Sequence, residues 1–364
     1  MKNHQPDYLF ISAVFALVVF GLIALNSASM VISRENFGGS YYYLKHQILY
    51  GLSIGLIGFF ICQRINYRWW KKIAFPILIL SLVFLAAVFL PGMGYEGNEA
   101  RRWITVGSIS FQPFELVKLS FILYLSALLS RSEEIKKNIK ESLIPFIAVF
   151  GIISVLVLFQ PNTSAFFIIS LIAGSIYFLA ELNLSYLAAA GLLAIVSFFV
   201  LIKTAAYRMK RFTVYLHPEM DPQGIGYQIN QALLAIGSGG LFGLGLGHSI
   251  QKWKYLPEVI GDSVFAIIAE EFGFIGAGFL IFLFIFLTWR GLRIAKNAPD
   301  KFGYLVVGGI IGWIFFQAFI NIAAICGIIP LTGMPLPFVS YGGTALAVTL
   351  TAAGIVVNIS KQTK

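Results

Sequence analysis

Charged residues are scarce in this sequence. Asp, Glu, Lys and Arg make up 12% of its 364 residues, whereas 58% of the residues are hydrophobic. A soluble domain usually carries about a quarter charged residues, so this composition excludes an ordinary soluble globular protein. Cysteine is also rare, and Cys62 and Cys326 stand at the ends of apolar runs far apart in the chain. We interpret both as small buried hydrophobic side chains.

Several common catalytic signatures are missing as well. The four histidines are dispersed and show no metal-ligand spacing. No Gly-x-Ser-x-Gly elbow occurs, and no Cys/His pattern indicates nucleophilic catalysis. The glycine-rich run 237–247 is followed by no Gly-Lys-Ser/Thr and preceded by no strand, which excludes a P-loop and a dinucleotide-binding fold.

Long apolar runs recur along the whole chain. A helix needs about 20 apolar residues to cross a bilayer, and continuous runs favour helices over an alternating β-barrel. The predicted spans are 8–28, 46–62, 73–90, 114–130, 142–159, 164–182, 185–204, 263–288, 303–328 and 343–359. The sequence therefore predicts an all-α polytopic membrane protein of about ten transmembrane helices, forming one domain over residues 1–364. The first run lacks a small-residue cleavage site, so we expect a retained first helix.

The distribution of Lys and Arg predicts the orientation. An even number of spans puts both termini on one side, and the loops of that side hold most of the cations. By the positive-inside rule, both termini are cytoplasmic. The net charge of +10 then indicates anionic inner-leaflet lipid rather than nucleic acid as the partner of these residues.

Other cations lie on the predicted outer side, against this bias. They are Arg101, Arg102, Arg208, Lys210, Arg211, Lys252 and Lys254. They fall in loop 91–113 and in the long loop 205–262 between helices 7 and 8. Cations kept on the outer face indicate an anionic ligand there.

The first outer loop leads into the fourth span. Arg101, Arg102 and Trp103 form a cationic and aromatic edge that suits phosphate, although anchoring at the lipid headgroups explains it more simply. Glu115 and Lys118 lie three residues apart on one helix face. Charges inside a span pair with each other or serve function, so a structural ion pair and a substrate-groove role are both open.

The second outer loop contains an acidic residue at the mouth of a span. Asp262 follows the run LPEVIG, with Glu258 four residues earlier and Glu270 and Glu271 deeper in the same apolar run. A carboxylate at a partly desolvated edge can act as a general base. An Asp immediately before an apolar helix is also a preferred N-cap, and the two roles are compatible.

The last outer loop, 328–344, is stiffened by three prolines. Ser340 and Tyr341 could hydrogen-bond a sugar, but packing explains them more simply. Gln317 and Asn321 lie four residues apart on the ninth span, which favours hydrogen bonds between helices. The loops 91–113, 205–262 and 328–344 together form the expected active-site face.

Four strings in these regions resemble the SEDS family of bacterial shape, elongation, division and sporulation proteins. They are NEARRWITVGSISFQPFELVKL, YRMKRFTVYLHPEMDPQGIGYQINQALLAIGSGGLFGLGLG, KYLPEVIGDSVFAIIAEEFGFIG and TGMPLPFVSYGGT. The third string favours the division branch, typified by FtsW, over the elongation branch, typified by RodA. Two positions depart from the family pattern: Phe114 replaces a small residue, and Asn162 replaces an acid, so we assign no catalytic role to Asn162.

The resemblance implies a peptidoglycan glycosyltransferase that polymerises lipid II on the outer face of the bacterial cytoplasmic membrane, at the division septum. It implies a class B penicillin-binding protein and other divisome proteins as partners. By the resemblance Asp262 is the catalytic base. The groove residues that it implies are Arg101, Arg102 and Lys118, with Trp103 as a contact of a sugar or of the loop. We add Glu115, Arg208, Glu258 and Ser340 to the candidate substrate-binding residues.

Two other functions compete with polymerisation. A lipid II flippase needs access from both faces and usually shows two related halves, but the sequence has no internal repeat. A non-catalytic divisome scaffold would not require Asp262 or the paired arginines. No cofactor is evident, and no sequence feature supports a divalent cation site.

Overall fold

The computed structural model describes residues 5–90, 101–106, 109–131, 139–182 and 206–363. These residues form a helical bundle with one short antiparallel β-hairpin. The helices are α1 (Tyr8–Phe37), α2 (Tyr42–His46), the π-helical turn η1 (Gln47–Leu52), α3 (Ser53–Cys62), α4 (Tyr67–Ala87), α5 (Pro113–Leu129), α7 (Ile139–Phe159), α8 (Thr163–Leu179), α10 (Ala206–Leu216), the 3-10 turn η2 (Pro218–Met220), α11 (Ile225–Ser238), α12 (Val264–Lys296), α13 (Lys301–Ile325) and α14 (Gly343–Ser360). The hairpin strands are β1 (Ile104–Val106) and β2 (Ile109–Phe111), with Thr105 opposite Ser110.

Every predicted span that falls within the described residues coincides with a helix. The predicted span 185–204 lies outside the described residues. The span predicted at 46–62 is part of a continuous helical segment, α2, η1 and α3. The predicted long outer loop 205–262 contains the helices α10 and α11.

The described helices suit a membrane in length and in surface. By length and composition, six of them can cross a bilayer: α1, the α2–α3 segment, α4, α12, α13 and α14. Large hydrophobic side chains are exposed along α1, α3, α4, α7 and α12. Such continuous apolar surface is rare on a soluble monomer and is expected of helices that face lipid. The chain is therefore an all-helical polytopic membrane protein.

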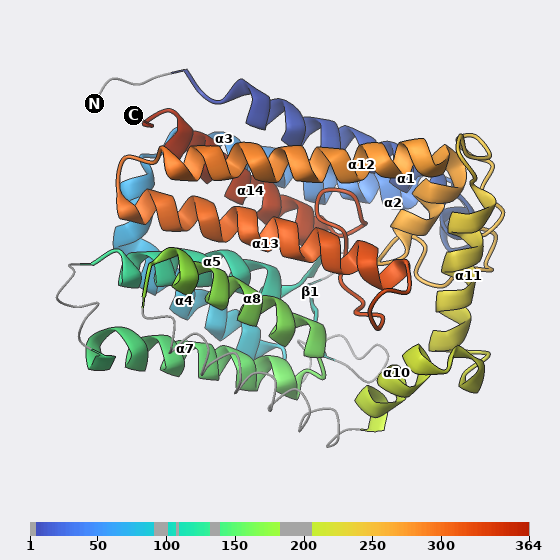
Figure 1. The fold of residues 1–364 in the computed structure, drawn as a ribbon, viewed down its shortest axis with the longest axis horizontal. Helices are drawn as coiled ribbons and strands as arrows, with labels where there is room; N and C mark the ends of the chain where they lie inside the picture. Colours follow the sequence, from blue (N-terminus) through green and yellow to red (C-terminus); the bar gives the residue numbers. More distant parts are fainter. Residues whose placement is uncertain (1–4, 91–100, 107–108, 132–138, 183–205, 364) are drawn as a thin grey trace.

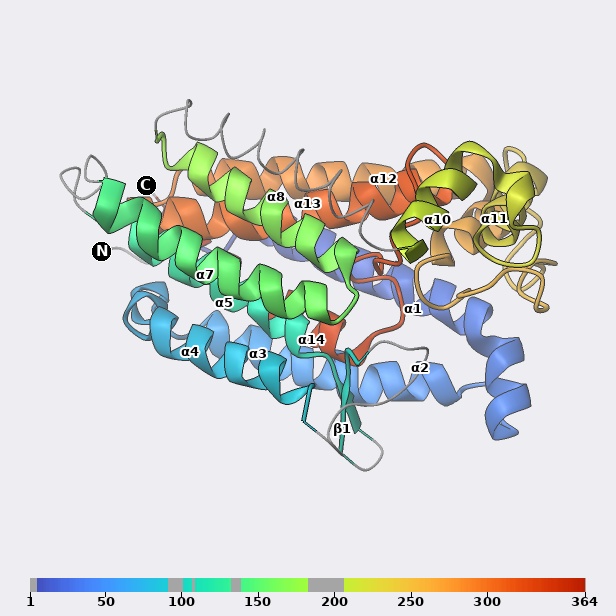
Figure 2. The same cartoon turned by 90° about the horizontal axis from the view of Figure 1, so that it is seen from below.

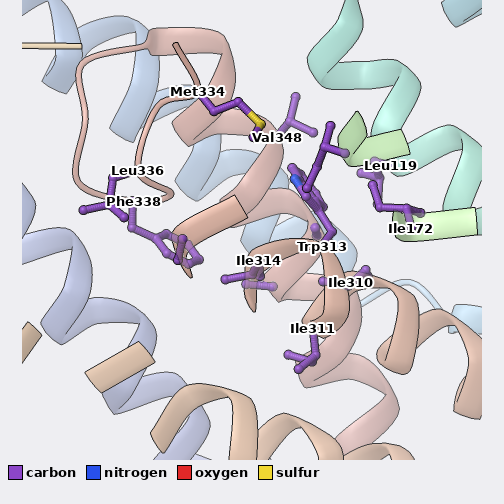
Figure 3. Packing of buried hydrophobic residues seen from close by; sticks show 14 of the residues in the cluster. Leu119, Ile172, Ile310, Ile311, Trp313, Ile314, Met334, Leu336, Phe338 and Val348 are labelled. Carbon is purple, nitrogen blue, oxygen red and sulfur yellow. The ribbon is translucent and has the colours of Figure 1, made fainter. Parts of the chain in front are cut away.

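The core of the bundle lies around α13 and α14. Both helices are mostly buried, whereas α4 is mostly exposed. Helix α13 packs against α5, α8, α12 and α14, and α14 also packs against α3. Figure 3 shows the indole of Trp313 on α13 with Leu119 of α5, Ile172 of α8 and Met334 around it. The central helices thus hold the loops at their ends in fixed positions.

The two ends of the bundle differ. Figure 1 shows the N- and C-termini together at one end, while α10, α11 and the loop leading to α12 lie at the other. Figure 2 gives the same arrangement in a second view. The end with α10 and α11 is therefore the one that carries the predicted outer loops.

Helix α12 is broken near its outer end. Gly273 has φ 67° and ψ −166°, a conformation that ordinary L-residues rarely adopt. The glycine-rich loop fills the break: Leu244 and Gly245 donate their amides to the carbonyl oxygens of Glu270 and Glu271, at 2.9 and 3.0 Å. The break thus allows the loop to hydrogen-bond to the first turns of α12. Irregular backbone in a membrane protein is expected where the protein itself supplies the hydrogen-bond partners.

Candidate active site

Asp262 lies in the last turn before α12. The loop that leads to α12 lies at the end of the bundle opposite both termini (Figure 1). The residue that caps α12 is Ser263, and no side chain accepts a capping bond there. The N-cap interpretation of Asp262 is therefore wrong. The reason is local: the chain turns between Glu258 and Ser263, because the Glu258 carbonyl accepts the amides of Gly261 and Ser263 at 3.0 and 3.2 Å. This turn places Asp262 one residue too early to cap the helix.

The Asp262 carboxylate contacts α11 instead. Gln228 Nε2 donates to Asp262 Oδ1 at 3.3 Å and to Ser263 Oγ at 3.0 Å. The Ser263 hydroxyl also donates to Asp262 Oδ1, at 3.4 Å. Gln228 was not among the residues predicted from the sequence, since it carries no charge. Its place in the first turn of α11, beside a charged loop, is the only signal that points to it.

The surroundings of Asp262 raise its pKa to about 6. Burial contributes most, because it penalises the charged carboxylate, and the negative charge of Glu258 acts in the same direction. The Ser263 hydrogen bond and the positive charge of Arg211 on α10 oppose this rise. A carboxyl with this pKa is mostly ionised at neutral pH but remains basic enough to take up a proton.

The backbone at Asp262 is held by α13. Asn321 Nδ2 donates to the Asp262 carbonyl oxygen at 2.8 Å and to the Met334 carbonyl oxygen at 2.7 Å. One turn earlier, Gln317 Nε2 donates to the Pro335 carbonyl oxygen at 2.8 Å. Gln317 makes the expected bond between helices, because it accepts from Lys118 of α5 at 2.8 Å. The two amides together also fasten the last outer loop and the backbone of Asp262.

Glu115 and Lys118 form a buried ion pair. Lys118 Nζ lies 2.9 Å from Glu115 Oε1, and the two side chains are only 2% and 4% exposed. Lys118 Nζ also donates to Gln317 Oε1 at 2.8 Å and lies 4.6 Å from the Trp313 ring centroid. The predicted ion pair is thus present in the structure, and the substrate-groove role stays a prediction. The ammonium group is therefore linked through Gln317 to the same loop that faces Asp262.

The pair of arginines precedes the β-hairpin. Arg101 is exposed and Trp103 is partly buried. Arg102 donates from Nε to the Gln160 carbonyl oxygen at 3.3 Å and from Nη2 to the Pro161 carbonyl oxygen at 2.5 Å. These bonds fix Arg102 at the junction between α7 and α8. Residues 91–100 and 107–108 of the first outer loop lie outside the described residues.

The last outer loop approaches Asp262 through its backbone. Ser340 is 5% exposed, and its hydroxyl accepts the Leu336 amide at 2.8 Å. The Tyr341 amide donates to the Ile260 carbonyl oxygen at 2.8 Å, two residues before Asp262. In this conformation Ser340 therefore stabilises the loop, while Tyr341 joins the loop to the turn that carries Asp262.

The remaining predicted residues lie around the same face. Glu258 has φ 51° and bends the chain before Asp262. Arg211 Nη1 donates to the Leu331 carbonyl oxygen at 3.4 Å, so α10 also contacts the last loop. Arg208 lies in α10, but its side chain is outside the described residues. Asn162, which replaces the acid of the family, accepts the Ala165 amide at 3.1 Å and caps α8.

A second buried charge cluster was not predicted from the sequence. Lys252 Nζ lies 2.9 Å from Glu271 Oε1, with side chains 2% and 1% exposed, and Ser27 Oγ donates to the same carboxylate at 2.7 Å. Glu270 accepts the Ile250 amide at 2.9 Å and the Ser249 hydroxyl at 2.5 Å. The cluster fastens the outer loop to α12 and α1. Lys252 was grouped with the outer cations, but its charge is used inside the protein.

Among the described residues, no group of three or more His, Cys, Asp or Glu side chains is placed to hold a metal ion.

Comparison with known proteins places this arrangement in a family. Residues 7–364 match the family model for the cell cycle proteins FtsW, RodA and SpoVE. This is the SEDS family. The chain belongs to it. Since the match extends over nearly the whole sequence, the resemblance seen in four strings extends to the complete helical bundle of this SEDS protein.

Individual relatives of this SEDS protein cover it from end to end. It is 38% identical to stage V sporulation protein E of Bacillus subtilis (strain 168), over 100% of this chain and 99% of the relative. It is 37% identical to the probable peptidoglycan glycosyltransferase FtsW of Trichlorobacter lovleyi, over 99% and 94%. A solved chain from a peptidoglycan synthase complex that coordinates polymerization and crosslinking superposes with a TM-score of 0.79, at 27% identity over 98% of each chain.

Proposed function

We propose that this protein is a peptidoglycan glycosyltransferase that polymerises lipid II, with Asp262 as its general base. One observation carries the proposal: the Asp262 carboxyl has a pKa raised to about 6 and is held at the outer end of the bundle by groups from α11 and α13. The relatives named as probable peptidoglycan glycosyltransferases support the reaction class. The matched chain from a peptidoglycan synthase complex supports it as well.

The chemistry follows from the carboxylate. In the proposed step, Asp262 takes the proton of the 4-hydroxyl group of the acceptor sugar. The hydroxyl oxygen attacks the anomeric carbon of the lipid-linked donor strand. The bond from that carbon to the diphosphate breaks, and the diphosphate leaves with the electron pair. A pKa near 6 lets Asp262 be ionised before the step and protonated after it.

The leaving diphosphate needs positive charge. Arg211 is close enough to lower the pKa of Asp262, so a cation already acts on this site. Arg101, Arg102 and Arg208 would extend the cationic surface toward the diphosphate, as preorganised donors that stabilise developing negative charge. Trp103 would contact a sugar ring or the loop.

The amides would act by positioning. Gln228 orients the carboxylate of Asp262, and Asn321 fixes its backbone. Lys118 and Glu115 would support the floor of the substrate groove through Gln317, rather than meet the substrate directly. Ser340 would keep the last outer loop folded, and Glu258 would set the pKa of Asp262.

We further propose that the protein works in the cytoplasmic membrane at the division septum, beside a class B penicillin-binding protein that crosslinks the new strands. The matched solved chain comes from a complex in which polymerization and crosslinking are coordinated. A polymerase of this design would release its glycan beside such a partner.

The deciding experiment is polymerisation of purified lipid II by the full chain with its crosslinking partner. Asp262→Asn removes the base and keeps the size of the side chain. Glu219→Gln is the matched control, because Glu219 is an exposed carboxylate on the same face. We expect polymer from the wild type and from Glu219→Gln, and at least about a 100-fold loss in Asp262→Asn.

Equal polymer from Asp262→Asn and the wild type would overturn the assignment of the base. No polymer from any variant, with lipid II moving across vesicles, would favour a flippase. No polymer and no movement, with the partner still bound, would favour a scaffold.

A further inference from the structure

A cavity of about 450 Å³ opens at the end of the bundle that carries both termini, opposite the candidate active site. Three segments form its walls: the start of α1, the last turns of α12 and the end of α14. Its volume lies within the range of about 300–1,000 Å³ that is usual for ligand pockets. Neither the proposed reaction nor the predicted outer loops involve it.

Asp7 holds the three walls together. Its carboxylate accepts from Arg290 Nε on α12 at 2.8 Å and from the Phe10 amide at 3.0 Å, which caps α1. The Asp7 amide donates to Ser360 Oγ at the end of α14, at 3.1 Å. The negative charge of Asp7 is therefore compensated by Arg290 and by the amide at the start of α1.

Arg293 supplies an uncompensated positive charge. It lies three residues after Arg290, on the same side of α12, and its side chain is exposed. In the part of the chain that the structure describes, Arg293 bonds no protein acceptor. Arg290 bonds Asp7 through its Nε, and its guanidinium carbon lies 6.0 Å from the centroid of the Trp289 ring. Two arginines and one aspartate line the cavity, so the net charge of its lining is positive. The planar guanidinium group binds phosphate oxygens through two parallel hydrogen bonds.

Aromatic residues place the cavity at the depth of lipid headgroups. Tyr8 lines it and is 60% exposed, and Trp289, which precedes Arg290 on α12, is 52% exposed. Exposed Tyr and Trp are enriched at the membrane–water boundary. Leu9 lines the cavity and Leu292 lies on α12 close by; both are exposed apolar side chains beside which acyl chains can lie. The positive-inside distribution puts this end in the anionic inner leaflet.

We propose that this cavity binds the headgroup of an anionic phospholipid. Arg293 and the free end of Arg290 hold the phosphate diester. Asn297 and Thr363, which also line the cavity, face the hydroxyl groups of the headgroup. The lipid joins α1, α12 and α14 at the end of the bundle remote from Asp262.

The test is native mass spectrometry of the full-length protein titrated with phosphatidylglycerol, phosphatidylcholine or inorganic phosphate. Arg293→Gln is compared with Arg64→Gln, an exposed arginine at the same end of the bundle but outside the cavity. We expect phosphatidylglycerol to bind and phosphatidylcholine to bind more weakly. Arg293→Gln should reduce phosphatidylglycerol affinity about fivefold, the effect of one basic residue near a charged bilayer, while Arg64→Gln stays within about twofold.

An equal loss in both variants would show a diffuse surface attraction and overturn the proposal. Displacement of phosphatidylglycerol by millimolar inorganic phosphate would assign the cavity to free phosphate and overturn the choice of a lipid. Equal binding of the two lipids would remove the role of the positive charge. Circular dichroism confirms that each variant is folded.

Discussion

Asn321 Nδ2 lies 2.8 Å from the carbonyl oxygen of Asp262, although 59 residues separate the two in sequence. The same nitrogen reaches the Met334 carbonyl oxygen at 2.7 Å, so one buried amide holds the proposed base and the loop beside it. The position of the Asp262 carboxyl thus depends on the core of α13 as well as on its own loop.

Asn321→Ala tests this dependence. Both hydrogen bonds disappear, so we expect kcat for lipid II polymerisation to fall by about tenfold or more, with KM nearly unchanged. Asn230→Ala, on an exposed position of α11, is the control and should keep wild-type kcat. The measurement is initial polymerisation rate against lipid II concentration. A change in KM alone would argue that Asn321 shapes the groove instead.

The pKa of Asp262 predicts the pH profile of the reaction. The base works only when it is ionised. The polymerisation rate should therefore increase about tenfold per pH unit below pH 6 and become constant above it. Glu258→Gln removes the negative charge that raises this pKa. The rising limb should therefore move to lower pH in Glu258→Gln, as measured by polymerisation rate from pH 4.5 to 8. An unmoved limb would exclude Glu258 as a neighbour that sets the pKa.

The same pKa has a consequence for stability. The folded-state pKa lies above the ordinary value of 3.8, so between about pH 4 and 6 the folded protein binds more protons at Asp262 than the unfolded chain does. The contribution of this group to stability therefore falls as pH rises through that window. Asp262→Asn should remove this fall, which denaturant midpoints at pH 4 and pH 7 would show.

The two lysine–glutamate pairs of the outer loop offer a matched comparison. Lys252 and Glu271 are almost fully buried, whereas Lys254 and Glu35 lie 3.0 Å apart with side chains 67% and 43% exposed. Lys252→Met leaves a buried carboxylate without its cation, and we expect a loss of about 3–5 kcal/mol in unfolding free energy. Lys254→Met should cost less than about 1 kcal/mol.

Thermal unfolding of both lysine variants in detergent provides the measurement. The double variant Lys252→Met/Glu271→Gln should recover part of the loss, because no buried charge then remains unpaired. If the double variant is less stable than Lys252→Met alone, the cluster acts through packing rather than charge.

The broken helix gives a further pair of variants. A Cβ atom on Gly273 would lie 2.3 Å from the Gly243 nitrogen. Alanine would also have to adopt the positive φ of this position, which is strained for an L-residue, so Gly273→Ala should displace the glycine-rich loop. A Cβ on Gly278, further along α12, meets nothing within 4 Å. We expect Gly273→Ala to lose most polymerisation activity and Gly278→Ala to keep it. Limited proteolysis of loop 239–263 checks the displacement directly.

The helical frame could be predicted from the sequence because a lipid solvent imposes long apolar runs. The pairing of Glu115 with Lys118 was also within reach, since their spacing puts them on one helix face. The break at Gly273 was not, because glycine in an apolar run is common and its φ depends on the loop that fills the break. Periodicity alone carries no sign of that loop.

The candidate site shows a similar division. Asp262 and Glu258 stand out as charges beside an apolar run, so sequence reasoning finds them. Gln228 and Asn321 are neutral amides, and their partners lie on distant segments. The prediction for Lys252 is wrong for the opposite reason. Its charge predicts a position on the outer surface, whereas the ion pair with Glu271 is buried. Long-range packing decides each of these cases.

Because Gly273 breaks α12, the proposed base lies beside a short helical segment that is separate from the longer part of the helix. The part of α12 beyond it, Phe274 to Lys296, has roughly 23 residues and so measures about 34 Å, close to the hydrocarbon thickness of a bilayer. The bilayer therefore constrains the tilt of this longer segment only. The short segment of α12 before Gly273 is positioned by its contacts with the glycine-rich loop and α13. The height of the Asp262 carboxylate is therefore set by the protein and not by the thickness of the bilayer.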